Sequence, residues 1–254
     1  METEAKSKLI AALDVPTASQ ARELVARLKN EVGMFKVGSQ LFTSAGPEFV
    51  REVVASGQKV FLDLKFHDIP NTVAAAATEA TRLGVTILNI HAAGGAEMMR
   101  RTAAAVSEVA TAEGLSRPAV IAVTVLTSAD ETTLSAIGIT GSPQEQVLKL
   151  GRLAAENGMD GLVASPLELR ALRAAIPQPG FLLVTPGVRP EGSGRGDQKR
   201  VASPADAIGA GADYLVVGRP IAGADDPVAA ARSIVSEMAA AMNQGESREA
   251  GTAR

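Results

Sequence analysis

Charged side chains that could do proton chemistry are concentrated in the run DLKFHD, residues 63–68. Asp63 and Lys65 stand two residues apart, so in a β-strand both side chains project to one side while the leucines next to Asp63 face the helices. A carboxylate beside an ammonium group keeps the ammonium protonated. This pairing suits a lysine that donates a proton and argues against a Schiff-base lysine, which must be neutral to attack. An ordinary surface ion pair is the alternative, and the second acid, Asp68, makes it less attractive.

Two more charged residues lie within or at the end of apolar runs. Lys36 lies inside MFKVG (34–38), and Asp14 closes LIAALD (9–14). A charge inside a short buried strand must point into a polar opening or be paired. We therefore expect Lys36 to belong to a functional site, whereas a solvated strand end remains the alternative for Asp14.

The run DYLVVGRPI (213–221) has the residue types that bind anions. Gly218 lets the backbone approach an anion closely, and the planar guanidinium of Arg219 can bind two phosphate oxygens. The preceding segment VTPGVRPEGSGRGDQKR (184–200) is rich in glycine and cationic side chains. Its glycine density is typical of a lid that becomes ordered on binding. A disordered insertion is the alternative, in which Arg189 and Gln198 face solvent.

Composition excludes several kinds of chemistry. The chain has no cysteine, which removes disulfides and thiolate nucleophiles, and two histidines leave little for a soft-metal site. We expect His67 and His91 to be structural hydrogen-bonding residues, because neither has an evident nucleophile to activate. The chain has 25 lysine and arginine residues against 28 aspartate and glutamate residues, and the basic ones form no block. This charge distribution argues against nucleic acid as a partner.

No stretch approaches the ~20 apolar residues of a membrane span. The polar start METEAKSK also lacks the apolar core of a signal peptide. We therefore expect a soluble, cytoplasmic protein without a membrane partner.

Eight apolar runs alternate with Ala-rich, 3.6-periodic stretches that are predicted helices. The predicted strands are 9–14, 34–38, 59–64, 85–90, 119–125, 160–165, 181–185 and 213–218. The predicted helices are 17–30, 46–57, 71–84, 95–114, 142–158, 165–176, 203–211 and 226–242. The pattern predicts a single-domain α/β fold, a (β/α)8 TIM barrel over residues 1–242, followed by a disordered tail over 243–254. A doubly wound open sheet is the competitor, but it lacks G-x-G-x-x-G after the first strand.

A barrel enzyme builds its site at the C-terminal ends of its strands, and here almost every strand ends on a polar residue. These residues are Asp14, Lys36, Asp63, Lys65, Asn89, His91, Thr124, Thr127, Ser165, Thr185, Arg189, Gly218 and Arg219.

Six motifs follow one another from the start of the chain to its end. They are Asp14 in ALDV, Lys36 in KVG, the run DLKFHDIPNT, the segment VTVLTS, the segment VTPGVRP…GDQ and the run VVGRPI. Together they resemble the bacterial orotidine 5′-phosphate decarboxylase family over nearly the whole length. The D-x-K-x-x-D core is shared with sugar-phosphate decarboxylases of the same superfamily, so the specificity comes from the full set in this order.

The resemblance implies decarboxylation of orotidine 5′-monophosphate (OMP) to uridine 5′-monophosphate (UMP) in de novo pyrimidine biosynthesis, without metal or organic cofactor. Lys65 is implied to stabilise and protonate the carbanion at C6, with Asp63 near the substrate carboxylate. Asp68 is implied to reach in from the partner subunit of a homodimer with shared active sites. Lys36 joins this charge network, and Asp14 and Lys36 are implied to contact ribose hydroxyls.

The resemblance also assigns residues that bind substrate. Thr72 of the partner is implied at the ribose and Thr127 at the pyrimidine. Gln198, Gly218 and Arg219 are implied to hold the phosphate, with Arg189 as a lid contact.

Two other functions remain open. A metal-assisted decarboxylase or aldolase acting on a sugar phosphate needs a further carboxylate ligand at a strand end, where Asn89 and His91 stand. A noncatalytic protein that binds phosphoribosyl ligands has no reason to place Lys65 between two acids, because desolvating three charges costs free energy that binding does not recover.

Overall fold

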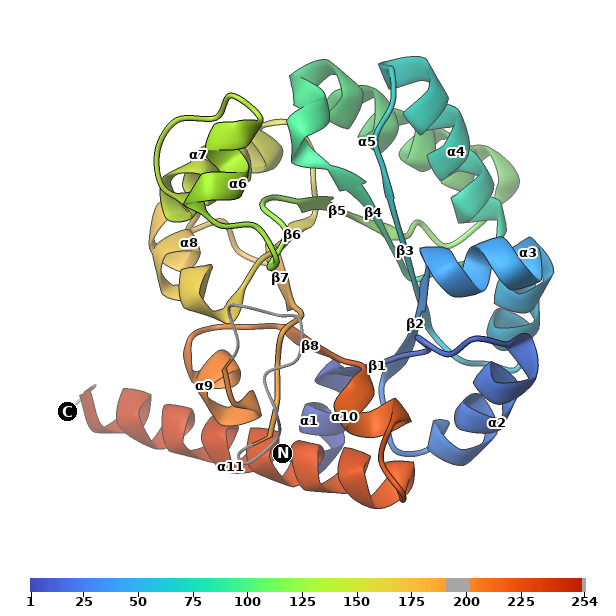
Figure 1. Cartoon of the computed structure of the whole chain (residues 1–254), viewed down its shortest axis with the longest axis vertical. Helices are drawn as coiled ribbons and strands as arrows, with labels where there is room; N and C mark the ends of the chain where they lie inside the picture. Colours follow the sequence, from blue (N-terminus) through green and yellow to red (C-terminus); the bar gives the residue numbers. More distant parts are fainter. Residues whose placement is uncertain (191–201, 253–254) are drawn as a thin grey trace.

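The structure, a computed structural model, describes residues 1–190 and 202–252. Eight parallel strands close into a barrel in chain order, and β1 pairs with β8 through Ile10 opposite Val216 (Figure 1). The strands are β1 (Leu9–Ala12), β2 (Met34–Gly38), β3 (Val60–Phe66), β4 (Ile87–His91), β5 (Ala119–Val123), β6 (Gly161–Val163), β7 (Leu182–Thr185) and β8 (Tyr214–Val217). The predicted barrel is confirmed, and the closing pair excludes the open sheet.

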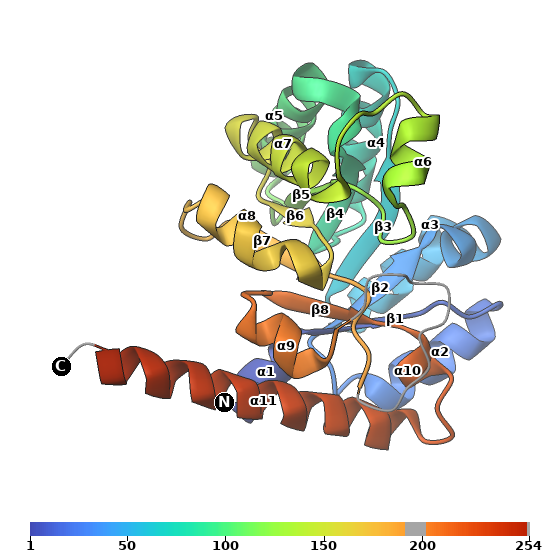
Figure 2. The ribbon, with the colours of Figure 1, turned by 60° about the vertical axis from the view of Figure 1, so that its left-hand side comes forward.

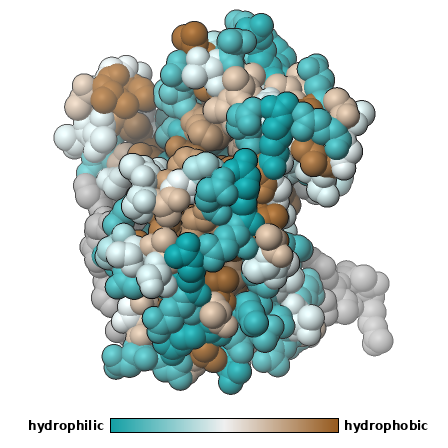
Figure 3. Space-filling view, turned by 90° about the vertical axis from the view of Figure 1, so that its right-hand side faces the viewer, coloured by the Kyte–Doolittle hydropathy of each residue, from teal (hydrophilic) through white to brown (hydrophobic). Residues whose placement is uncertain are grey.

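Helices surround the barrel (Figures 1 and 2). They are α1 (Glu2–Lys8), α2 (Ala18–Leu28), α3 (Ser39–Ala55), α4 (Pro70–Arg82), α5 (Gly95–Glu113), α6 (Glu131–Ala136), α7 (Pro143–Glu156), α8 (Leu169–Ala175), α9 (Pro204–Gly209), α10 (Arg219–Ala222) and α11 (Pro227–Thr252), with short 3₁₀ turns η1 (Ala92–Gly94) and η2 (Pro166–Glu168). Figure 3 shows the side covered by α2, α3 and α4, where hydrophilic residues dominate and apolar ones lie between them. In the described part of the chain, no helix combines the length and apolar character needed to cross a membrane.

Helix starts follow capping chemistry. Thr17 accepts a hydrogen bond from the Gln20 backbone at the start of α2. Ser142 and Glu145 form a reciprocal capping box at α7, directly before Pro143 in the first turn. Each cap satisfies backbone N–H groups that the helix itself cannot pair.

The core has two layers. One lies between the strands and the helices, and the other fills the barrel with inward side chains that include Met34, Phe61 and Ile87. Because inward side chains recur every second residue, the next inward positions after these three are Lys36, Asp63 and Asn89. A layer of polar side chains therefore lies directly above the apolar layer, toward the C-terminal ends of the strands.

Several elements differ from the predicted ones, among them the short helix α10, which was not predicted. Helix α1 comes from a polar segment without periodicity, yet it buries Ala5 and packs against α11. Helix α6 is short and buries Leu134. Helix α3 starts earlier than predicted and breaks at Gly46 (φ 70°), directly before Pro47. The predicted helix corresponds to its second half, because proline fits the first turn of a new helix.

Helix α11 runs through most of the segment 243–254, for which the sequence predicts a disordered tail. The division of the chain at residue 242 stays a prediction.

Candidate active site

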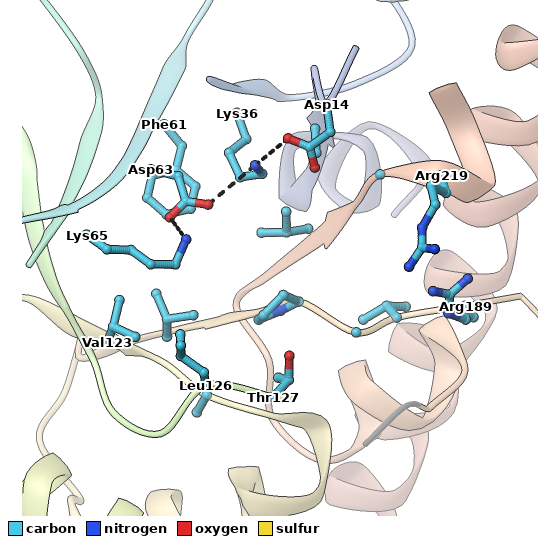
Figure 4. Close-up of a pocket in the computed structure, with 18 of the residues that line it drawn as sticks. Asp14, Lys36, Phe61, Asp63, Lys65, Val123, Leu126, Thr127, Arg189 and Arg219 are labelled. Atoms are coloured by element: carbon cyan, nitrogen blue, oxygen red, sulfur yellow. Dashed lines mark hydrogen bonds and ion pairs between the residues drawn. The ribbon is translucent and has the colours of Figure 1, made fainter. Parts of the chain in front are cut away.

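A cavity of about 460 Å³ opens at the C-terminal ends of the barrel strands (Figure 4). Eight residues predicted from the sequence line it: Asp14, Lys36, Asp63, Lys65, Thr127, Arg189, Gly218 and Arg219. The charged ones gather at two ends. Asp14, Lys36, Asp63 and Lys65 lie at one end, and the two arginines lie at the other.

The first end is a row of alternating charges, Asp14–Lys36–Asp63–Lys65, which we call the charge chain. The Lys36 Nζ donates to Asp14 Oδ1 at 2.9 Å and lies 3.3 Å from Asp63 Oδ2. The Lys65 Nζ donates to Asp63 Oδ1 at 2.6 Å. The two ammonium groups therefore hold both oxygens of one carboxylate.

Burial and pairing oppose each other in the charge chain. Burial disfavours the Lys36 ammonium, but the Asp63 and Asp14 carboxylates outweigh it and raise the pKa of Lys36. Burial likewise disfavours the Asp63 carboxylate, but Lys36, Lys65 and a hydrogen bond from Asn89 outweigh it and lower the pKa of Asp63. Both groups therefore stay charged near neutral pH, although their side chains are only 10% and 12% exposed.

The backbone at Lys65 departs from a regular strand. Its φ of 52° lies in the left-handed region, and it is the one described residue other than glycine with a positive φ. The β3–β4 pairing shifts register between Leu62 and Phe66, and the Lys65 N–H donates at 2.8 Å to the Asn89 side chain. Such a conformation costs roughly 1–3 kcal/mol and persists only where its surroundings hold it.

The second end of the cavity is cationic. Arg189 and Arg219 point toward one another in Figure 4; Arg189 lies in the segment after β7, and Arg219 is the first residue of α10, which follows β8. Burial, and then the charge of Arg219, lower the pKa of Arg189. The buried Arg189 Nε has no hydrogen-bond partner among the described residues. Two guanidinium groups facing one cavity suit an anionic group on a ligand.

Three predicted residues lie elsewhere. Asp68 and Thr72 are exposed beyond the end of β3 and do not line the cavity of this chain. The Asp68 carboxylate accepts a hydrogen bond from the Ile69 N–H at 2.6 Å. Gln198 lies outside the described residues, as do Gly192, Gly194 and Gly196 of the predicted lid, whereas Gly187 lines the cavity.

The two histidines lie beside the charge chain. The rings of His67 and His91 are 5.4 Å apart, and neither lines the cavity. Burial, followed by the charges of His67 and Lys65, lowers the pKa of His91. Within residues 1–190 and 202–252, no cluster of three His, Asp or Glu side chains is placed to hold a metal ion.

Asn89 is a site residue to which sequence reasoning assigned no role. It is fully buried, and its side chain contacts both Asp63 and the Lys65 backbone. Its place two residues after an inward apolar residue was a signal, but its partners depend on the register shift.

The fold and the cavity define a (β/α)8 barrel enzyme with a charged site at the C-terminal face. Residues 7–234 match the model of the family described as Orotidine 5'-phosphate decarboxylase / HUMPS family. The chain therefore belongs to that family, whose decarboxylases are carboxy-lyases, and the resemblance seen in the sequence is confirmed.

Individual relatives agree over most of their length. The chain is 57% identical over 235 residues to an orotidine 5'-phosphate decarboxylase of Moorella thermoacetica, covering 92% of this chain and 93% of that one. It is 52% identical over 245 residues to one of Syntrophotalea carbinolica, covering 96% and 100%. A crystal structure of orotidine 5'-phosphate decarboxylase from Lactobacillus acidophilus superposes with a TM-score of 0.80 at 38% identity, covering 91% of this chain and 98% of that chain.

Proposed function

We propose that this chain decarboxylates OMP to UMP in de novo pyrimidine biosynthesis. The charge chain at one end of the cavity carries the proposal, since it holds two ammonium groups against one buried carboxylate. The two arginines at the other end suit the 5′-phosphate, and membership of the family supplies the reaction.

Lys65 is the proposed proton donor. When the bond between C6 and the carboxylate breaks, CO₂ leaves and its electron pair stays on C6. The Lys65 ammonium stabilises this charge and transfers one proton to C6, and the neutral amine then regains a proton from water. Asp63 accepts a hydrogen bond from the Lys65 ammonium and so holds it in place before the reaction, and the Asp63 charge lies near the substrate carboxylate. Lys36 completes the alternation of charge.

Binding roles follow the ends of the cavity. Gly218, Arg219 and Gln198 hold the phosphate, and Arg189 contacts it from the lid. At the charge chain, Asp14 and Lys36 contact ribose hydroxyls, and Thr127 contacts the pyrimidine.

A homodimer with shared sites accounts for the two residues outside the cavity. We assign Asp68 and Thr72 to the cavity of the partner subunit. In support, Ile69, which lies between Asp68 and the start of α4, is 67% exposed, and Ile137, directly after α6, is 68% exposed. Exposed apolar side chains at the barrel mouth fit a surface that a second copy covers. A cytoplasmic location stays a prediction.

The test is the loss of OMP absorbance with purified protein after exhaustive dialysis against a chelator. We expect full activity with no added metal. Activity that is lost and then restored by Mg²⁺ supports the sugar-phosphate class of the same superfamily. Tight UMP binding without turnover supports a noncatalytic binding protein.

A further inference from the structure

Asn89 makes hydrogen bonds with both Asp63 and Lys65, although it does not line the cavity itself. Its Nδ2 donates to Asp63 Oδ1 at 2.7 Å, and its Oδ1 accepts from the Lys65 N–H at 2.8 Å. The side chain is fully buried and does not line the cavity. Its contacts are therefore with the machinery and not with a ligand.

The two partners need opposite chemistry, which a primary amide supplies. The Asp63 carboxylate needs a donor, and the Lys65 N–H needs an acceptor. The register shift between Leu62 and Phe66 interrupts the β3–β4 ladder at this point, and the Asn89 side chain accepts the hydrogen bond of the Lys65 N–H. No apolar side chain of similar size supplies either group.

The contacts fix position as well as satisfy polar groups. Asp63 Oδ1 receives both the Lys65 ammonium and the Asn89 amide, so the amide sets how the carboxylate is turned. The other contact holds the Lys65 main chain in its left-handed conformation, from which the side chain reaches back to Asp63. Asn89 therefore fixes the positions of both the Asp63 carboxylate and the Lys65 ammonium. Asn89 is itself held in β4, where it pairs with Ile121 of β5.

We propose that Asn89 is a positioning residue for the decarboxylation, which turns the Asp63 carboxylate and holds the Lys65 main chain so that the Lys65 ammonium stays aimed at the reacting carbon. The inference rests on the proposed function. It assigns no contact between Asn89 and substrate.

The test uses Asn89→Leu, which keeps the volume but loses both polar groups, and Asn89→Ala, which relieves any clash. We expect kcat to fall about 10- to 100-fold in each, which corresponds to ~1.4–2.7 kcal/mol. The affinity for UMP should stay within about threefold of the original protein, because Asn89 does not line the cavity.

The pH profile separates positioning from general destabilisation. Losing the Asn89 donor raises the pKa of Asp63, so the acid limb of the kcat profile should move to higher pH. The other charged groups that act on Asp63 are Lys36 with its partner Asp14, Lys65 and His91, and both variants leave them unchanged.

Asn157→Ala is the matched control. Asn157 is also buried, and it also makes two side-chain hydrogen bonds, with Arg100 and the Leu153 carbonyl, but at the end of α7. We expect that variant to lose stability while kcat and the pH profile stay unchanged.

Unchanged kcat and acid limb in a folded Asn89 variant overturn the inference, as does an equal fall of kcat in Asn157→Ala. Loss of UMP affinity in parallel with kcat also overturns it. If the original protein does not decarboxylate OMP, the proposed function is wrong. The positioning of Lys65 can still be tested in that case by hydrogen exchange. If the Lys65 amide hydrogen exchanges as slowly in Asn89→Leu as in the original protein, Asn89 does not hold the Lys65 main chain and the inference is wrong. If both variants fail to fold, Asn89 is a structural residue and the inference is wrong.

Discussion

Lys36→Met tests whether the charge chain is an energetically coupled unit. The change removes the ammonium group and keeps most of the apolar stem. Two acids lose a partner, but unequally. The Asp14 side chain is 50% exposed and can be well hydrated, whereas the Asp63 side chain is 12% exposed and is hydrated far less. The cost therefore comes mainly from Asp63.

The expected magnitude follows from this burial. Removing one partner of a buried ion pair costs roughly 3–5 kcal/mol, because a charge is left without compensation. Asp63 keeps the Lys65 ammonium and the Asn89 amide, so we expect the lower end, about 3 kcal/mol. That is a large part of a typical domain stability of ~5–15 kcal/mol.

The assay is urea unfolding at pH 7, with the free energy of unfolding extrapolated to water. Lys59→Met is the control, since Lys59 is exposed just before β3 and its loss should change stability by no more than about 0.5 kcal/mol. A loss below about 1 kcal/mol in Lys36→Met, the range of surface pairs, refutes the reasoning.

Three further perturbations probe the other parts of the account. Arg219→Ala should weaken UMP about tenfold or more while hardly changing uridine, because a charged hydrogen bond contributes ~1.5–3 kcal/mol; equal weakening of both ligands in calorimetry rejects the phosphate assignment. Lys65→Ala and Asp68→Ala should each be nearly inactive, but a co-expressed random mixture should regain about one quarter of the original activity per site, because half of the dimers then hold one intact site. Exchange of subunits, confirmed by mass, without any recovered activity means that Asp68 serves its own chain. In pH-dependent unfolding, the lowered pKa of Asp63 adds stability above about pH 4, and this stability is lost as the pH falls toward the pKa of Asp63 in the folded protein. The raised pKa of Lys36 adds stability below about pH 10, and this stability is lost as the pH rises through the pKa of Lys36 in the folded protein. If the free energy of unfolding changes between pH 5 and 9, and the Lys36→Met variant does not show that change, these pKa directions for Asp63 and Lys36 are wrong.

The barrel could be predicted from the sequence because each strand is buried on both faces and therefore appears as an apolar run. The predicted run 34–38 is the observed β2, and 181–185 differs from β7 by one residue. Helices α1 and α6 could not be predicted in the same way, because seven and six residues are too short for a clear helical period.

The charge chain was also accessible from the sequence. Alternation placed Asp63 and Lys65 on one side, and the charge of Lys36 inside a short apolar strand indicated a functional residue, which the resemblance assigned to the same charge network. The left-handed backbone at Lys65 and the role of Asn89 were not accessible, since both depend on a register shift between β3 and β4. Strand periodicity carries no signal for such a shift. The contribution of Asp68 across a dimer interface came from the resemblance and stays a prediction.

The central claim is that the Lys65 ammonium stabilises and protonates the reacting carbon. The most direct measurement is kcat for OMP decarboxylation by Lys65→Ala, with UMP affinity measured on the same preparation. The account predicts no measurable turnover with nucleotide binding retained, because the cation is needed mainly where negative charge develops. Turnover within about tenfold of the original protein, or ~1.4 kcal/mol of barrier, contradicts the claim.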